Sequence, residues 1–410
     1  MDIFHLISIL IVLSAGFAYI NFRFLKLPNV IGLMLVSLIF SILILISGYF
    51  FPAFRTAITD RFERINFSEI LLEGMLSFML FAGAIHIKLE DLKKERLSII
   101  LFSTISVLIS TFIVGIVSYY LLHALGLKID LKSAFLFGAL ISPTDPIAVM
   151  SILKTTGISK SLETKIAGES LFNDGVAVVI FITIYQLSLP GAKLDAGSIA
   201  LLITQEAIGG LLLGLALGFL GYRLMVSIDN YQVEVLITLA IVMGGYTLAS
   251  QLHISGPLAM VAAGLVTGNR GKTHGMSDIT REYIDKFWEL IDEILNAVLF
   301  VLIGLELLVI DTYRLVIIAG FILIFVVLIT RYISIWIPSI AIRRREKITR
   351  PTLYILTWGA LRGGISIALA LSMDPAMYRD VWVTITFIIV CFSILVQGLT
   401  IGKFARKVRG

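Results

Sequence analysis

The stretch Ser142-Pro143-Thr144-Asp145-Pro146 interrupts a run of residues that is otherwise apolar enough to cross a membrane. Each proline lacks a backbone N–H and clashes with the preceding turn, so the pair predicts a break in a helix. A broken helix at membrane depth is tolerated where it is buried in protein or lines a cavity. We therefore expect this stretch to offer free backbone carbonyls, two helix ends and the carboxylate of Asp145 inside the protein.

A second stretch, Gly168-Glu169-Ser170-Leu171-Phe172-Asn173-Asp174-Gly175, follows along the chain. Ser170, Asn173 and Asp174 are spaced i, i+3 and i+4, which places them on one face of a helix. A carboxylate at bilayer depth is costly and indicates a functional site by default. Together with the segment around Asp145, this face predicts an oxygen-lined cage for a small cation that can also take up protons.

Structural roles for the same residues stay open. Asp145 could be only the N-cap of the second half of the broken helix, and Ser170 and Asn173 could simply bond to neighbouring helices. Glu169 and Arg362 are both charged residues within apolar runs, and we expect them to form a structural ion pair. Breaking a buried pair of this kind is strongly destabilising, because it leaves one charge without a partner.

The composition indicates a polytopic membrane protein, with a mean hydropathy of +0.98 and only 15% charged residues. A run of roughly 20 apolar residues crosses a bilayer as a helix, and by this criterion we predict about thirteen spans. Their approximate ranges are 2–20, 30–50, 67–86, 97–125, 131–153, 161–188, 196–226, 231–252, 254–268, 280–309, 311–342, 350–373 and 378–402. Residues 52–66 instead predict an amphipathic helix at the membrane interface.

Most Lys and Arg residues fall in alternate loops, among them 343–350 and 403–409. The positive-inside rule then predicts an N-terminus outside the cell membrane and a C-terminus in the cytoplasm. The net charge of +5 is accounted for by these loops and calls for no nucleic-acid partner. No cofactor is expected, because the glycines lack a phosphate-binding lysine or a dinucleotide-binding spacing.

An internal repeat is visible in the two interrupted spans. The fifth span is broken at 143–146 and the twelfth at 359–364. An offset of seven spans inverts the topology, and interrupted segments in corresponding positions of inverted halves indicate the binding site of a transporter. We predict an all-α fold of two inverted six-helix repeats, spans 1–6 and 8–13, joined by span 7.

The stretches 142–149 and 168–175 resemble the two signature stretches of monovalent cation/proton antiporters of the NhaP and NHE type. Residues 361–366 are similar to the family's Arg-Gly motif on the second broken helix, and residues 81–92 resemble the end of its third span. The resemblance extends over residues 78–370. It implies crossed broken helices, a homodimer, and transport helices at 67–188 and 280–373. Dimerisation or scaffold helices would then be 1–50, 196–268 and 378–402.

The resemblance also implies residue roles. Asp174 would be the main ion and proton carboxylate, with Ser170 and the backbone of Thr144 as further Na⁺ ligands. Asp145 and Asn173 would organise the site. One departure concerns the third-span motif, where many relatives have a Glu that binds the cation and this chain has Ala82. That difference leaves the selectivity among Na⁺, Li⁺ and K⁺ open.

These patterns predict a secondary transporter that exchanges cytoplasmic Na⁺ or Li⁺ for external H⁺ and serves pH homeostasis. Cation and proton would compete for Asp174, and one titrating carboxylate beside a non-titrating Asn173 predicts electroneutral 1:1 exchange. Three alternatives are weighed against this hypothesis: a K⁺/H⁺ antiporter, an intramembrane aspartyl protease using Asp145 and Asp174, and a channel. The protease motif Gly-x-Gly-Asp is absent before Asp174, and no selectivity-filter loop is visible.

Overall fold

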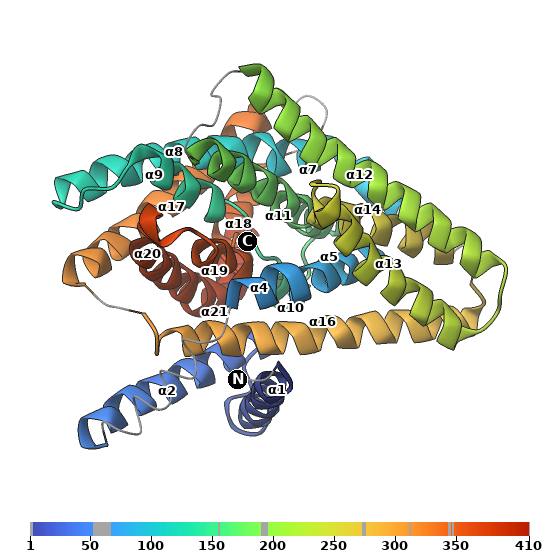
Figure 1. The fold of residues 1–410 in the computed structure, drawn as a ribbon, viewed down its shortest axis with the longest axis horizontal. Helices are drawn as coiled ribbons and strands as arrows, with labels where there is room; N and C mark the ends of the chain where they lie inside the picture. Colours follow the sequence, from blue (N-terminus) through green and yellow to red (C-terminus); the bar gives the residue numbers. More distant parts are fainter. Residues whose placement is uncertain are drawn as a thin grey trace.

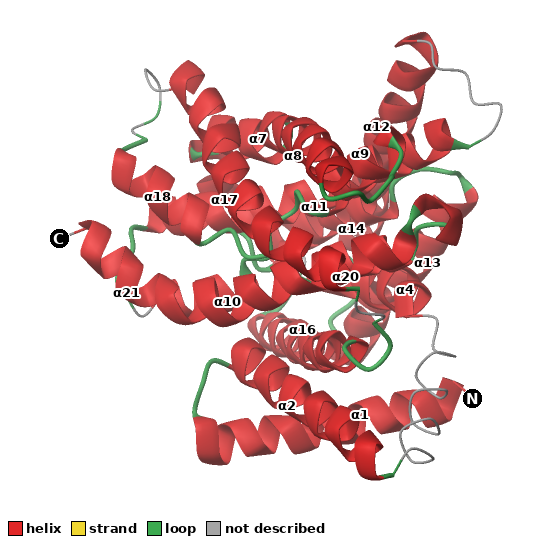
Figure 2. Cartoon of the chain, turned by 90° about the vertical axis from the view of Figure 1, so that its left-hand side faces the viewer, coloured by secondary structure: helices red, strands yellow, loops and turns green. Residues whose placement is uncertain are grey.

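The computed structural model describes residues 3–51, 67–154, 156–189, 196–272, 276–310, 313–342, 346 and 348–409. In this part of the chain the secondary structure is helical, apart from one isolated antiparallel bridge between Asp145 and Leu361. Figures 1 and 2 show long helices packed around shorter ones near the centre of the molecule. The predicted all-α fold is confirmed. The amphipathic helix predicted at 52–66 lies outside the described residues.

Helix boundaries follow the predicted ranges closely. The α-helices are α1 (Ile3–Ile20), α2 (Asn29–Phe50), α4 (Phe67–Glu69), α5 (Leu76–Ile85), α6 (Leu89–Lys94), α7 (Arg96–Ser103), α8 (Ile105–Ala124), α9 (Leu131–Leu140), α10 (Ile147–Lys154), α11 (Lys160–Ser188), α12 (Ala196–Val226), α13 (Tyr231–Gln251), α14 (Gly256–Val266), α16 (Asp278–Glu306), α17 (Arg314–Ile342), α18 (Arg350–Trp358), α19 (Gly364–Leu371), α20 (Arg379–Phe392) and α21 (Gly398–Arg409). Wider π-helical turns are η1 (Asn21–Leu25), η2 (Ile70–Met75), η3 (Thr267–Gly271) and η5 (Ser393–Gln397), and η4 (Pro375–Met377) is a short 3₁₀ turn.

Eight helices of the described chain are long and apolar enough to cross a membrane. The predicted spans missing from these eight have identifiable reasons. The fifth and twelfth are divided into α9 and α10 and into α18 and α19, the third is the shorter apolar helix Ile70–Ile85, and α14 is short. The tenth, α16, carries several charged residues in its first half. The total of about thirteen spans therefore remains a prediction from apolar run lengths.

Two groups of helices can be distinguished by their packing. In the first group, α16 packs against α1, α2, α5 and α13, and α14 packs against α5, α12 and α13. In the second group, α17 packs against α8, α18 and α20, α11 packs against α7 and α9, and α21 packs against α10 and α18. The two groups meet where α11 packs against α12 and α14 and where α19 packs against α16. Figures 1 and 2 show α16 lying between the α1–α2 pair and the rest of the molecule.

The predicted division into transport and scaffold helices stays a prediction, and it cuts across these packing groups in three places. Spans 67–86 and 280–309, which contain α5 and α16, are predicted with the transport helices, but they pack with the first group. The span at 378–402, which contains α20, is predicted with the scaffold, but it packs with the second group. The contact of α5 with α14 is close: a Cβ on Gly264 would lie 2.8 Å from the carbonyl oxygen of Phe81.

Candidate functional site

The two broken helices meet at their breaks. The first break, residues 141–146, separates α9 from α10, and the second break, residues 359–363, separates α18 from α19. The backbone N–H of Asp145 donates to the carbonyl oxygen of Leu361 at 2.8 Å. Four helix ends are therefore brought together inside the protein, as expected from the prolines of the first break and the glycines of the second.

Charged side chains stabilise these helix ends. Arg362 is 2% exposed, and its Nη1 donates to the carbonyl oxygens of Ser142 at 2.5 Å and Pro143 at 2.7 Å. A cation favours the C-terminal end of a helix, where carbonyls lack partners within the helix. Asp145 has the complementary position, because its Oδ1 accepts the backbone N–H of Ile147 at 2.9 Å at the start of α10. This contact caps one N–H at the start of α10, but Pro146 occupies the N-cap position itself, because its carbonyl accepts the first helical bond, from Met150.

The polar face of α11 is bonded to the first break. Asn173 Nδ2 donates to Thr144 Oγ1 at 2.9 Å, and the N–H of Thr144 donates to Asn173 Oδ1 at 3.4 Å. The hydroxyl of Ser170 donates to the carbonyl oxygen of Thr144. Ser170, Asn173 and Thr144 are all buried, whereas Asp174 is only partly buried. The structure therefore brings together the predicted group around Asp174 and leaves its carboxylate facing a cavity.

The buried ion pair differs from the predicted one. Glu169 Oε1 lies 2.6 Å from Arg331 Nη2 of α17, and both side chains are at most 5% exposed. Arg362, the predicted partner, is occupied by the carbonyls of the first break. The prediction that Glu169 pairs with Arg362 is therefore wrong, because its partner is Arg331. The physical reason is that the C-terminal end of α9 also needs a donor, and Arg362 on the adjacent break is within reach of it.

Gly363 allows Asp145 to approach the second break. A Cβ added to Gly363 would lie 2.6 Å from Asp145 Oδ2 and 2.8 Å from Asp145 Cβ. Real side chains do not reach such distances, so Asp145 would have to move. The position of this carboxylate thus depends on a residue without a side chain more than 200 positions away in sequence.

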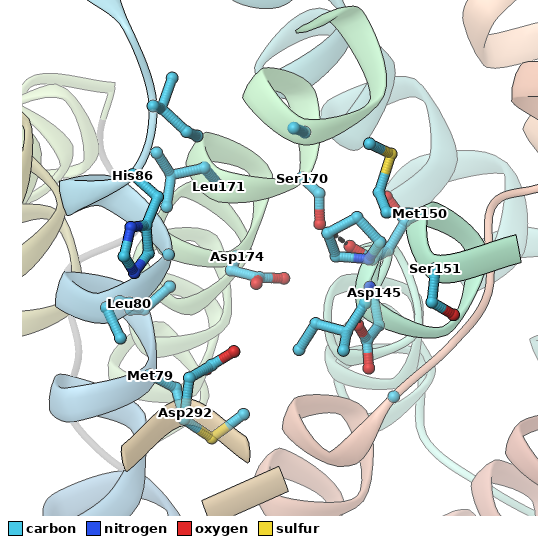
Figure 3. A pocket seen from close by; sticks show the side chains of 18 of the residues that line it. Met79, Leu80, His86, Asp145, Met150, Ser151, Ser170, Leu171, Asp174 and Asp292 are labelled. Atoms are coloured by element: carbon cyan, nitrogen blue, oxygen red, sulfur yellow. Dashed lines mark hydrogen bonds between the residues drawn. The ribbon is translucent and has the colours of Figure 1, made fainter. Parts of the chain in front are cut away.

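A cavity of about 760 Å³ extends from Asp174 and Asp145 to the protein surface. Its inner wall includes Ser170, Thr144 and Gly363, and its outer part includes the exposed side chains of Lys88 and Lys154. Figure 3 shows Asp174, Asp145 and Ser170 around the same space. Both carboxylates therefore have access to water from one side of the protein, and hydroxyl and carbonyl oxygens lie close by.

Asp292 also lines the cavity, and the sequence patterns do not predict it. It lies on α16, it is partly buried, and Figure 3 shows its side chain directed into the space next to Asp174. The sequence does contain a signal for Asp292, because an ionisable residue inside a predicted span indicates function by default. It carries little weight in the sequence, because the first half of the span at 280–309 holds several other charged residues. Ala82 and Gly83 of α5 line the cavity as well.

Ion pairs at the mouth of the cavity neutralise much of its positive charge. Lys160 Nζ lies 2.8 Å from Asp91 Oδ2, and Lys154 Nζ lies 3.8 Å from Glu163 Oε1. The hydrogen bond from Lys160 holds the pKa of Asp91 below its usual value, so Asp91 is charged at neutral pH. Within the described residues, ion pairs are found for these mouth carboxylates and none is found for Asp174, Asp145 or Asp292.

Among the described residues, no three His, Cys, Asp or Glu side chains are arranged to hold a metal ion. The arrangement at Asp174 is different: carboxylates combined with hydroxyl and carbonyl oxygens at two helix breaks. Oxygen donors of this kind suit a hard cation. Broken helices that meet within a membrane fold, with a carboxylate between them, define the protein as a secondary transporter.

Comparison with known proteins agrees with this class. The family model described as "Sodium/hydrogen exchanger, transmembrane" matches residues 9–407, so the chain belongs to this family and is a transporter rather than an enzyme. It is 46% identical over 409 residues to the Na⁺/H⁺ antiporter NhaP of Pseudomonas aeruginosa, covering 98% of this chain and 96% of that protein. It is 34% identical to the Na⁺/H⁺ antiporter NhaH of Halobacillus dabanensis, covering 99% and 98% of the two chains.

The fold is also similar to a solved structure. The sodium proton antiporter MjNhaP1 from Methanocaldococcus jannaschii, at pH 8, superimposes with a TM-score of 0.78. The alignment covers 99% of this chain and 98% of that one at 20% sequence identity. At this identity the likeness establishes the fold. The predicted family and fold class are therefore both confirmed.

Proposed function

We propose that this protein is a Na⁺/H⁺ antiporter of the cell membrane that exports cytoplasmic Na⁺ in exchange for external H⁺. The observation that carries the proposal is the carboxylate of Asp174, which faces a water-accessible cavity without a basic partner among the described residues. The Na⁺/H⁺ antiporter relatives, matched over nearly the whole chain, support the choice of substrates. The protease alternative is set aside, because the family consists of transporters.

Competition at one carboxylate couples the two ions. Asp174 faces water through the cavity, so its carboxyl group can exchange a proton with that water. When ionised, Asp174 can bind Na⁺ together with the hydroxyl of Ser170 on the same face of α11. The carbonyl of Thr144 in the first break, which is bonded to that hydroxyl, would be the third ligand. When protonated, Asp174 cannot bind Na⁺. Each ion therefore displaces the other, and one site serves both directions of exchange.

Movement of one helix group against the other would expose the site alternately to the two sides of the membrane. The packing suggests the second group, with α7 to α11 and α17 to α21, as the transport unit. The first group, with α1, α2, α5, α12 to α14 and α16, would be the scaffold and would contain the contact between two copies of a homodimer. This proposed division differs from the predicted one at α5, α16 and α20.

The orientation follows from the basic loops. Lys88, Lys154 and Lys160 line the outer part of the cavity, and by the positive-inside rule this side is cytoplasmic. The N-terminus would then lie outside and the C-terminus in the cytoplasm. In this arrangement the cavity opens to the cytoplasm, from which Na⁺ would be taken up.

Purified protein in liposomes tests the proposal. An imposed pH gradient is followed with a pH-sensitive dye, and Na⁺, Li⁺ or K⁺ is then added in separate runs. We expect saturable dissipation of the gradient by Na⁺ and Li⁺, and a much weaker response to K⁺. A response to K⁺ alone would show that the substrate is K⁺ and not Na⁺. This outcome is tested because Ala82 stands where a glutamate ligand is expected from the family resemblance, which leaves the selectivity open. No response to any of the three cations would overturn the antiport function.

A further inference from the structure

The cavity lies between two walls that belong to different helix groups. One wall is formed by α11 and the two breaks and contains Asp174 and Asp145. The opposite wall is formed by α5 and α16. Figure 3 shows Asp174 and Asp292 on these facing walls, with Met79 and Leu80 of α5 nearby. A cation that reaches Asp174 from the cavity mouth therefore passes between the two groups.

Asp292 is the inner charged residue of the α5–α16 wall. Glu289 and Glu293, its neighbours on α16, also line the cavity but are exposed. On α5 the inner part of the wall offers Ala82 and Gly83, which have no charge. No ion pair is found for Asp292 within the described residues, whereas the mouth lysines Lys154 and Lys160 have carboxylate partners.

The two carboxylates occupy corresponding places on their helices. Asp174 and Asp292 are each about four helical turns from the starts of α11 and α16, counted at 3.6 residues per turn. Nearby negative charge of this kind raises the local concentration of a cation and its rate of association. Since Asp292 belongs to the other helix group, however, its position relative to Asp174 is set by how the two groups are arranged.

We propose that Asp292 is an access carboxylate that attracts Na⁺ to Asp174 from the side on which the cavity opens, and only from that side. This inference rests on the proposed function. When the second group moves so that Asp174 faces the opposite side, Asp292 stays on the first group with α1, α2 and α13, against which α16 packs. The residue therefore makes the apparent affinity for Na⁺ unequal on the two sides of the membrane.

Vesicles of opposite orientation test this asymmetry. Everted and right-side-out membrane vesicles are prepared from the same antiporter-deficient bacterial cells, and radioactive Na⁺ uptake against a proton gradient is measured in both. Asp292→Asn should raise the apparent KM for Na⁺ by about threefold to tenfold from the cavity side and leave the KM from the other side unchanged. The increase should shrink when ionic strength is raised with choline chloride, because salt screens the attraction.

Two further variants serve as controls. Asp292→Glu keeps the charge and should restore a KM close to wild type. Asp278→Asn removes a carboxylate from the same helix, at a side chain that is 97% exposed and pairs with Arg281, and should change neither KM. If Asp292→Asn changes the KM equally from both sides, or from neither, the inference is overturned. The proposed function still stands in that case, provided that wild-type vesicles exchange Na⁺. Wild-type vesicles that exchange no Na⁺ would overturn the proposed function, and the inference with it.

Discussion

Asp174 differs from its polar neighbours on α11 because their hydrogen-bond donors are already used, whereas its carboxylate has no donor and is free to bind a proton or a cation. Asn173 is bonded to Thr144, and Ser170 donates to the Thr144 carbonyl. These contacts hold the helix face against the first break. They leave the Asp174 carboxylate as the group on this face that can change its protonation state and face an incoming ion.

Asp174→Asn should therefore abolish exchange and leave the fold intact. The substitution removes the titrating charge with almost no change in volume. We expect Na⁺-driven proton flux in liposomes to fall to the level of liposomes without protein, with an unchanged melting temperature in detergent. Residual saturable flux in the purified variant would show that another carboxylate carries the proton.

The pair of Glu169 and Arg331 has a structural role that can be separated from transport. Glu169→Ala leaves the guanidinium of Arg331, 4% exposed, without its partner. We expect a loss of about 3–5 kcal/mol in stability, as for other buried pairs broken on one side. Thermal unfolding in detergent measures this. The double variant Glu169→Ala/Arg331→Ala should recover part of the loss, and a double variant less stable than the single one would contradict the pairing.

At the scale of elements, the breaks in α9–α10 and α18–α19 could be predicted because proline and glycine act locally on the backbone. Only the inverted repeat indicates that the two breaks meet. The sequence does not show which side chains connect them. Arg331 and Arg362 lie on different predicted spans, and helical spacing alone does not say which reaches Glu169. That choice depends on how α17 packs against α8 and α7, which is a property of the tertiary structure.

Gly363→Ala tests the contact between the breaks. The new methyl carbon would lie only 2.6 Å from Asp145 Oδ2, so the Asp145 side chain would be displaced. A weakening of Na⁺ binding by about 1 kcal/mol would raise the apparent KM about fivefold. Liposome exchange assays at graded Na⁺ concentrations measure this change. Gly244→Ala on α13, where an added Cβ meets nothing within 4 Å, is the matched control and should behave as wild type.

At the scale of the whole molecule, the apolar runs predict where helices lie but not which helices pack together. A helix such as α16 is apolar in its second half and charged in its first, and its place between α1–α2 and the centre is visible only in three dimensions. The same arrangement turns Asp292 towards the cavity. The sequence therefore predicts the candidate site on the wall formed by the breaks and α11 and points to Ala82 on α5, but it misses Asp292 on α16.

The number of charges moved in each cycle is the last prediction. Asn173 does not titrate, Asp145 accepts the N–H of Ile147, and Asp292 lies on the opposite helix group, so Asp174 is left to carry one Na⁺ or one proton. Exchange should then be 1:1 and electroneutral.

The free energy of an uncompensated charge that crosses the membrane would change by about 2.3 kcal/mol per 100 mV of membrane potential. Flux in liposomes whose potential is clamped with potassium and valinomycin should be independent of that potential. Acceleration by an imposed potential without a pH gradient would mean that a second proton is carried, and loss of the acceleration in Asp145→Asn or in Asp292→Asn would identify the group that carries it.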